Sequence, residues 1–269
     1  MEWSKIKNII LLILLGLNLF LLIMVVSQEL QARQFRQEAR EEAVALLERN
    51  GIAVDASVLP EDTSLPTQVL EEDLSVAETL AHALLGEDAV QQSTGVRAVY
   101  SSSLGEMETF STGRFAVDFT AQALPLHDRT AEEHAADLLQ RAGIQAEYLD
   151  SSHAEGATRI TYRQRWTDTP VFNAQITLAY QDGALRHMEG VLLPANDGVS
   201  QQEETITVAT LLVRFLSQRN ESGRMFSQIQ ALVPGYHLSG TRPFTLTPAW
   251  YVVTDTGTYV LSALDGSLF

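Results

Sequence analysis

The first long apolar run of the chain is Ile9–Val26, which is interrupted only by Gly16 and Asn18. As an α-helix, this run extends roughly 27 Å at about 1.5 Å per residue, close to the hydrocarbon thickness of a bilayer. Trp3 lies just before it, where an indole ring favours the membrane interface. The pattern predicts one membrane-spanning helix, residues 9–26, after a short segment, residues 1–8.

A cleaved signal peptide is the alternative for this run. Its apolar region would be shorter, about 7–15 residues, and only Val25–Ser27 weakly resembles a cleavage site. Positive charges do not decide the orientation, because they flank the run on both sides. A short basic N-terminus before a long domain is typical of a signal anchor. We therefore expect an uncleaved anchor, with the N-terminus cytoplasmic and the C-terminal domain extracytoplasmic, in the cell membrane.

Helical spacing continues beyond the apolar run, because Phe35, Ala39, Ala43 and Leu46 recur on one face before Gly51. This pattern predicts a juxtamembrane helix, residues 27–51. A plain amphipathic stalk and a helix that pairs with a partner both fit. The stripe is short and rich in alanine, which favours the stalk.

The rest of the chain repeats one order of elements three times, a helix followed by strands with alternating polarity. The first helix begins at a capping box, Ser75-Val-Ala-Glu78, and the second at another, Thr130-Ala-Glu-Glu133. A third helix starts near Thr207. The predicted strands are Val96–Ser101, Met107–Phe110, Arg114–Phe119, Arg159–Trp166, Phe172–Tyr180, Leu185–Leu193, Phe244–Leu246, Ala249–Thr254 and Thr258–Ser262.

Turn signals complete this outline. Asp182-Gly183 is a strong hairpin turn, and the acidic, proline-containing segment Leu59–Asp73 is typical of a loop. The sequence therefore predicts an α+β fold, in which repeated helix-plus-antiparallel-meander units follow the transmembrane helix. We place a first unit at residues 52–124 and two similar units in the C-terminal region, residues 125–269.

Charge is distributed unevenly along the chain. The net charge is −16, and residues 1–28 contribute +1 through Glu2, Lys5 and Lys7, so the remainder carries −17. Such a surface repels nucleic acid and anionic lipid headgroups, which argues against binding either.

Residue usage excludes several classes of chemistry. The chain has no cysteine, and its only lysines are Lys5 and Lys7. Thiolate catalysis, Cys-ligated metals, Ser–Lys dyads and Schiff-base lysines are therefore excluded from the soluble part. Neither a nucleophile elbow nor a glycine-rich phosphate loop occurs. We expect no enzymatic activity and no cofactor, although paired carboxylates would still permit acid–base chemistry.

Metal binding has little support in the sequence. Among the six histidines, His134 with Asp137 comes nearest to a ligand pair, and such pairs are common on solvated helix faces. The acidic runs Glu71-Glu72-Asp73 and Glu132-Glu133 lack EF-hand spacing. We expect no metal site.

Aromatic residues recur on the predicted strands. They would either line a groove for a peptide or glycan or form the packed face of a sheet, and packing is the commoner role. Trp166, before the turn Thr167-Asp-Thr-Pro170, is the best candidate for exposure.

Gly16 and Asn18 are the candidate partner-binding residues. A lone amide in hydrocarbon is costly unless it finds a partner, and a small residue lets another backbone approach closely. Asn18 would either bond to a partner span or bond to its own helix, and both alternatives stay open.

Both ends of the chain resemble the YycI family of Gram-positive bacteria. The resemblance rests on Met1-Glu-Trp-Ser-Lys5 and Leu17-Asn-Leu-Phe-Leu21, and on Thr247-Pro-Ala-Trp-Tyr251, Tyr259-Val-Leu-Ser-Ala263 and Asp265-Gly266. It implies a membrane-anchored regulator of a two-component system that controls cell-wall metabolism. Its partners would be a sensor histidine kinase and a YycH-like anchored regulator. The alternative is an exported α+β module in sporulation, germination or protease regulation.

Overall fold

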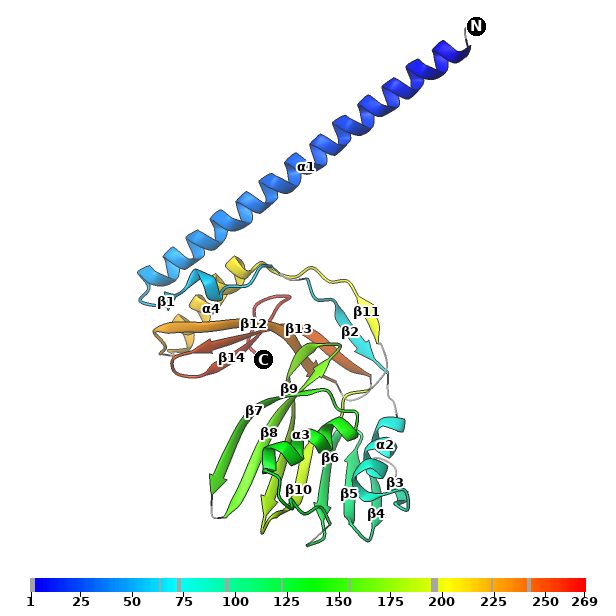
Figure 1. The fold of residues 1–269 in the computed structure, drawn as a ribbon. Helices are drawn as coiled ribbons and strands as arrows, with labels where there is room; N and C mark the ends of the chain where they lie inside the picture. The colour runs from blue at the N-terminus through cyan, green and yellow to red at the C-terminus, as the bar shows by residue number, and fades with distance from the viewer. Residues whose placement is uncertain are drawn as a thin grey trace.

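A computed structural model describes residues 3–62, 64–71, 74–94, 97–121, 123–154, 156–194, 198–223, 225–240 and 243–269. The chain begins with one long helix, α1 (Trp3–Arg49), which runs without a break through the predicted span and the predicted juxtamembrane helix (Figure 1). Gly51 then reverses the chain with a positive φ of 77°. The long helix projects away from the rest of the molecule, which is folded around its C-terminal end.

The other helices are α2 (Leu74–Leu85), α3 (Ala131–Arg141), α4 (Val208–Ser222) and the short 3-10 helix η1 (Ala56–Val58). The strands, in chain order, are β1 (Ala53–Val54), β2 (Thr67–Leu70), β3 (Val90–Thr94), β4 (Arg97–Ser102), β5 (Gly105–Phe110), β6 (Arg114–Phe119), β7 (Ala146–Ala154), β8 (Ala157–Trp166), β9 (Thr169–Gln181), β10 (Ala184–Val191), β11 (Val199–Gln201), β12 (Gln228–Ser239), β13 (Phe244–Thr254) and β14 (Thr258–Ser262).

Three antiparallel meanders follow three helices, as the repeated pattern predicts. Helix α2 precedes β3 to β6, α3 precedes β7 to β10, and α4 precedes β12 to β14. Strands β6 and β10 pair, so the first two meanders share one sheet. A parallel contact between β9 and β12 joins this sheet to the third meander. The α+β fold with antiparallel-rich sheets is therefore confirmed.

Apolar packing groups the elements into three clusters. The largest lies between α2, α3 and the sheet of the first two meanders, with Met107, Ile160 and Leu178 fully buried. A second cluster joins the C-terminal end of α1 to α4 and the third meander. The third cluster gathers buried residues of β2, β9, β12 and β13. The predicted boundary between residues 124 and 125 stays a prediction.

The junction between the two sheets is built from specific contacts. The side chain of Asn173 donates to Leu238 O and accepts from Leu238 N, both at 2.8 Å, so it extends the β9–β12 contact. Phe172 stacks on Tyr251 with ring centroids 5.0 Å apart. The Arg163 guanidinium lies 4.8 Å from the Tyr251 ring centroid, in a cation–π contact. These contacts join the sheet of the first two meanders to the sheet of the third.

Several local predictions need correction. Helix α2 begins at Leu74, so Ser75 lies inside the helix instead of capping it. The predicted loop Leu59–Asp73 contains β2, and Phe244–Leu246 and Ala249–Thr254 form one strand, β13. Trp166 is half-buried, because its ring packs edge-on against Tyr236 at 5.9 Å.

The capping box at Thr130 is confirmed. Its hydroxyl accepts from Glu133 N, and the Glu133 carboxylate accepts from Thr130 N, both at 3.1 Å. The predicted Asp182-Gly183 turn also joins β9 to β10.

Candidate functional site

The apolar segment of α1 is the candidate membrane span. It is long and apolar enough to cross a bilayer, and none of its most apolar 18-residue stretch is buried in the protein. The large apolar side chains from Ile10 to Val26 are between 46 % and 71 % exposed. Since so much apolar surface is costly in water, this part of α1 suits a lipid environment.

Asn18 bonds to its own helix in the structure. Its side-chain Nδ2 donates to Leu14 O at 2.8 Å, the second of the two predicted arrangements. Among the described residues, nothing donates to its Oδ1. The amide therefore keeps an acceptor with which a neighbouring span could bond, and partner binding stays a prediction.

Gly16 and Asn18 do not share one face of the helix. Residues two apart are separated by about 200° around an α-helix, so the two point in nearly opposite directions. Gly16 has open space around its Cα, where an added Cβ would meet nothing within 4 Å. A single partner helix centred on Asn18 would not contact Gly16 closely.

The C-terminal turns of α1 dock on the soluble domain. Ala43 and Leu47 are buried against the second cluster, at 3 % and 1 % exposure. Arg40 also donates to Leu59 O at 2.5 Å, which ties the helix to the segment after η1. Ala43 follows Val26 by about 26 Å along the helix axis, so this length of α1 separates the docking contact from the candidate span.

A groove runs along α1 from just beyond the candidate span to the level of this docking contact. One wall is the helix from Glu29 to Glu48, and the other is the segment from Ala56 to Asp62. We call it the juxtamembrane groove; its volume is about 760 Å³. The sequence did not predict this groove, because the segment Ala56–Asp62 that forms its second wall is distant in the chain from Glu29, where the helix wall begins. The arginines Arg36 and Arg40, four residues apart, were the available signal.

Charges in the juxtamembrane groove are only partly paired. Near the membrane end, Arg33 forms an ion pair with Glu29, with Nε and Oε1 3.1 Å apart. Arg36 donates to Ala32 O of its own helix at 3.2 Å. Among the described residues, neither Arg36 nor Arg40 has a carboxylate within 4 Å. The lining also contains five carboxylates against three arginines, so the groove is negative overall; the carboxylates are those of Glu29, Glu41, Glu48, Glu61 and Asp62.

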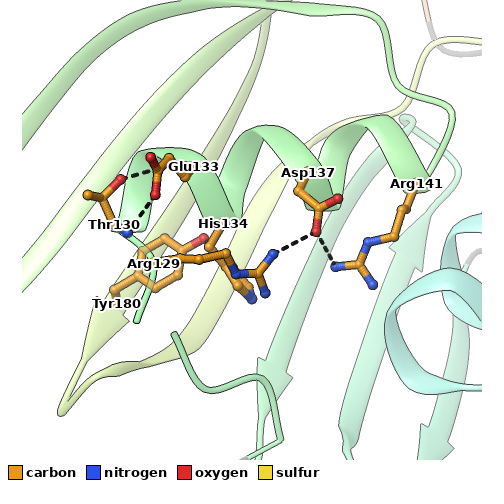
Figure 2. A network of polar contacts seen from close by, with 7 residues as sticks. All are labelled: Arg129, Thr130, Glu133, His134, Asp137, Arg141 and Tyr180. Carbon is orange, nitrogen blue, oxygen red and sulfur yellow. Dashed lines mark hydrogen bonds and ion pairs between the residues drawn. The ribbon is translucent and has the colours of Figure 1, made fainter. Parts of the chain in front are cut away.

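The predicted His134–Asp137 pair is divided between two environments (Figure 2). His134 is buried, and its Nδ1 lies 3.0 Å from Tyr180 Oη. Asp137 lies on the outer side of α3, where it pairs with Arg129 at 2.9 Å and Arg141 at 3.2 Å. The two side chains do not converge on a common point.

Burial keeps both His134 and Tyr180 neutral. It lowers the pKa of His134, and the positive charges of Arg129 and Arg141 lower it further. Burial also raises the pKa of the Tyr180 phenol. A neutral imidazole and a neutral phenol therefore form the contact, which is a stabilising hydrogen bond inside the core.

The other candidate groups are dispersed. Within the part of the chain that the structure describes, no three His, Asp or Glu side chains gather as metal ligands. Glu72 and Asp73 lie outside the described residues, and Glu133 caps α3. The strand aromatics pack: Tyr162, Phe172, Tyr180 and Trp250 are buried.

Comparison with known proteins assigns the chain to no family. No family model matches the chain, and no curated protein matches it. Among solved structures, the Bacillus megaterium YpeB C-terminal domain is 12 % identical with a TM-score of 0.38, covering 74 % of this chain and 96 % of that one. YycH from Bacillus subtilis is 9 % identical with a TM-score of 0.43; the match covers 74 % of this chain and half of YycH.

Proposed function

We propose that this chain is a non-enzymatic, membrane-anchored regulatory protein. It binds and modulates a sensor histidine kinase that controls cell-wall metabolism, together with a YycH-like anchored partner. The N-terminus is cytoplasmic, and the folded domain is extracytoplasmic. The resemblance of the chain's two ends to the YycI family supplies the identity of these partners.

The continuity of α1 is the observation that carries this proposal. One unbroken helix joins the candidate span to the domain, and its last turns are buried in the domain's core. A flexible linker would serve if the span were only a tether. A helix packed at its outer end instead fixes the domain relative to the span, which suits a protein that acts on other membrane proteins.

Three of the six histidines are engaged in contacts within the fold. His134 pairs with Tyr180 in the core, and His187 lies on an exposed strand with its Nδ1 2.7 Å from Asp118 Oδ1. His237 stacks on Phe269 with ring centroids 3.9 Å apart. These contacts favour structural roles for the histidines and support a binding protein over an enzyme.

Reconstitution tests the proposal directly. The full chain, the sensor kinase and the second anchored regulator of the same organism are placed together in lipid nanodiscs. We expect the three to co-purify and the autophosphorylation rate of the kinase to change by at least about twofold, compared with nanodiscs that hold the kinase alone. A kinase that neither co-purifies with the chain nor changes its rate would contradict the proposal.

A further inference from the structure

A stripe of uncharged residues runs along α1 through the candidate span and beyond it. Its members alternate between steps of three and four residues, the a and d spacing of a coiled coil, and all lie within one unbroken helix. We call this stripe the heptad seam. It consists of Leu11, Leu14, Asn18, Leu21, Val25, Gln28, Ala32, Phe35 and Ala39. The repeat continues for about four heptads, long enough to indicate a coiled-coil interface.

Charge separates the heptad seam from the other faces of α1 outside the span. Four of the residues between Gln28 and Ala39 are charged, and none of them lies on the seam; they are Glu29, Arg33, Arg36 and Glu38. An uncharged face on a helix that is otherwise polar is typical of a surface covered by a partner. Inside the span every face is apolar, so there Asn18 alone marks the seam.

Phe35 shows that the seam needs a cover outside the lipid. Its side chain is 73 % exposed, and it follows Val26 by about 13.5 Å along the helix. The headgroup layer adds only about 5–8 Å to each side of the hydrocarbon core, so the ring lies beyond it. Leu30, in contrast, follows Val26 by about 6 Å and lies at headgroup depth. Burying the Phe35 ring against a second helix would remove its apolar surface from water.

The space beside the outer end of the seam is open. Ala39 lines a groove between α1 and α4 whose volume is about 660 Å³. Leu46 and Val213 line the same groove, and Val213 is an exposed apolar residue of α4. The groove leaves room for a second helix to follow the seam as far as Ala39.

The neutrality of the seam fits a second copy of this chain. Two copies anchored in the same way lie parallel at the same depth, so each seam residue meets its own counterpart. A charged residue on the seam would then face an identical charge, and none is present. At the flanking positions, Glu29 would face Met24 of the second copy, and Arg36 would face Gln31. Like charges are therefore not opposed there either.

Asn18 is complementary to itself. A side-chain amide has two N–H donors and an acceptor oxygen, and Asn18 uses one N–H to donate to Leu14 O at 2.8 Å. Across a two-fold axis, the second N–H of each Asn18 could donate to Oδ1 of the other. A single asparagine at an a position favours two strands in register, which again fits a pair of identical helices.

We propose that α1 forms a parallel, in-register coiled coil with α1 of a second copy, through the heptad seam and with the two Asn18 side chains bonded to each other. The helices cross at about 20° with a left-handed twist, because a seven-residue repeat drifts by about 20° per heptad on a straight helix. This inference does not depend on the proposed function. A lower recovery of the kinase with Asn18→Leu would then report the loss of the dimer.

Cysteine crosslinking locates the interface, since the chain has no cysteine and one introduced thiol can pair only with its counterpart. Gln28 lies on the seam, whereas Gln34 and Gln37 lie on other faces of α1, and all three are exposed. The full chain is placed alone in phosphatidylcholine vesicles and oxidised. A disulfide needs Cα atoms within about 7 Å. We expect Gln28→Cys to give about five- to tenfold more disulfide-linked dimer than Gln34→Cys or Gln37→Cys.

Substitution of Asn18 tests the chemistry. The dimer fraction of Gln28→Cys is followed as the vesicles are diluted with lipid, which gives the affinity between copies. Asn18→Leu should weaken this affinity about three- to thirtyfold, the range expected for an interhelical hydrogen bond in a membrane. Asn18→Gln should retain most of it, because glutamine has the same donors and acceptor.

Four results would overturn the inference. They are equal crosslinking at the three glutamine positions, as random collisions would give; a maximum at Gln34 or Gln37; a chain that stays monomeric at every position; and an affinity that Asn18→Leu leaves unchanged. No kinase is present in these vesicles, so each of these results leaves the proposed function to its own test.

Discussion

Acidification should destabilise the fold through the buried His134. Only 2 % of this residue is exposed, and its ring meets Tyr180 edge-on with centroids 5.6 Å apart. Burial is the main cause of its lowered pKa, and Arg129 and Arg141 act in the same direction. A proton on this imidazole would have to be accommodated without solvent and beside two positive groups.

The sign of the effect follows from proton linkage. The unfolded chain takes up a proton at His134 below about pH 6.5, whereas the folded site stays neutral to a lower pH. The stabilisation is therefore fully present above about pH 6.5, and it is lost as the pH falls toward the folded pKa. Between pH 7.5 and pH 5.5, the free energy of unfolding should fall by up to about 1.4 kcal/mol from this residue.

Two variants isolate this contribution. His134→Leu leaves the Tyr180 hydroxyl buried without its partner, which should cost about 1–3 kcal/mol at pH 7.5. Adding Tyr180→Phe removes that hydroxyl and should recover much of the loss. Both variants should lack the acid sensitivity that His134 contributes, because neither has an imidazole at this position.

Denaturant unfolding of the full chain in detergent micelles, followed by near-UV circular dichroism, measures these differences. Other groups also titrate, including His237, whose pKa burial lowers as well. The test is therefore the difference between wild type and the double variant at each pH. Stability curves that stay parallel from pH 7.5 to pH 5.5 would refute the reasoning.

Three further predictions follow from other parts of the molecule. Asn18→Leu should weaken co-purification with the kinase or the second regulator by about 0.6–2 kcal/mol while leaving membrane insertion intact, and unchanged recovery would count against a role for the amide. Gly235→Ala should cost about 1–3 kcal/mol in thermal unfolding, because an added Cβ would lie 2.5 Å from Phe172 Cζ and 2.6 Å from Pro170 O; an unchanged Tm would contradict this packing. Protease added to intact protoplasts should digest the domain, and complete protection would reverse the predicted orientation.

The sequence predicted best where local chemistry determines the structure. The Thr130–Glu133 capping box, the Gly51 and Gly143 helix ends and the alternation in β6 each depend on residues close together in the chain. Strand β6 lies at the predicted residues, because its buried Phe115, Val117 and Phe119 alternate with less buried neighbours.

Elements that depend on distant partners were not predicted. Strand β12 contains Pro234-Gly235, a dipeptide typical of turns, yet it is held by pairing with β13 and by the Phe172 ring against Gly235. Strand β2 is short and lies in an acidic segment, and it forms because β13 and β11 flank it. Tertiary pairing outweighs local propensity in both cases.

In the candidate site, too, the features set by local sequence were predicted and those set by distant contacts were not. Asn18 stands out in the sequence as a polar residue within an apolar run, and its bond to Leu14 O involves only its own helix. The juxtamembrane groove needs the return of Ala56–Asp62 against α1, which no local pattern announces. Trp166 was expected to be exposed because it precedes a turn, but Tyr236 on β12 covers one side of it.

The unbroken helix α1 also makes the molecule a lever. From its buried contact at Leu47 to Trp3, α1 measures about 66 Å along its axis (Figure 1). A tilt of about 5° at the docked end would move the opposite end by about 6 Å, with no hinge needed along the way. Small rearrangements of the folded domain would therefore be amplified into larger displacements at the N-terminal end of the candidate span.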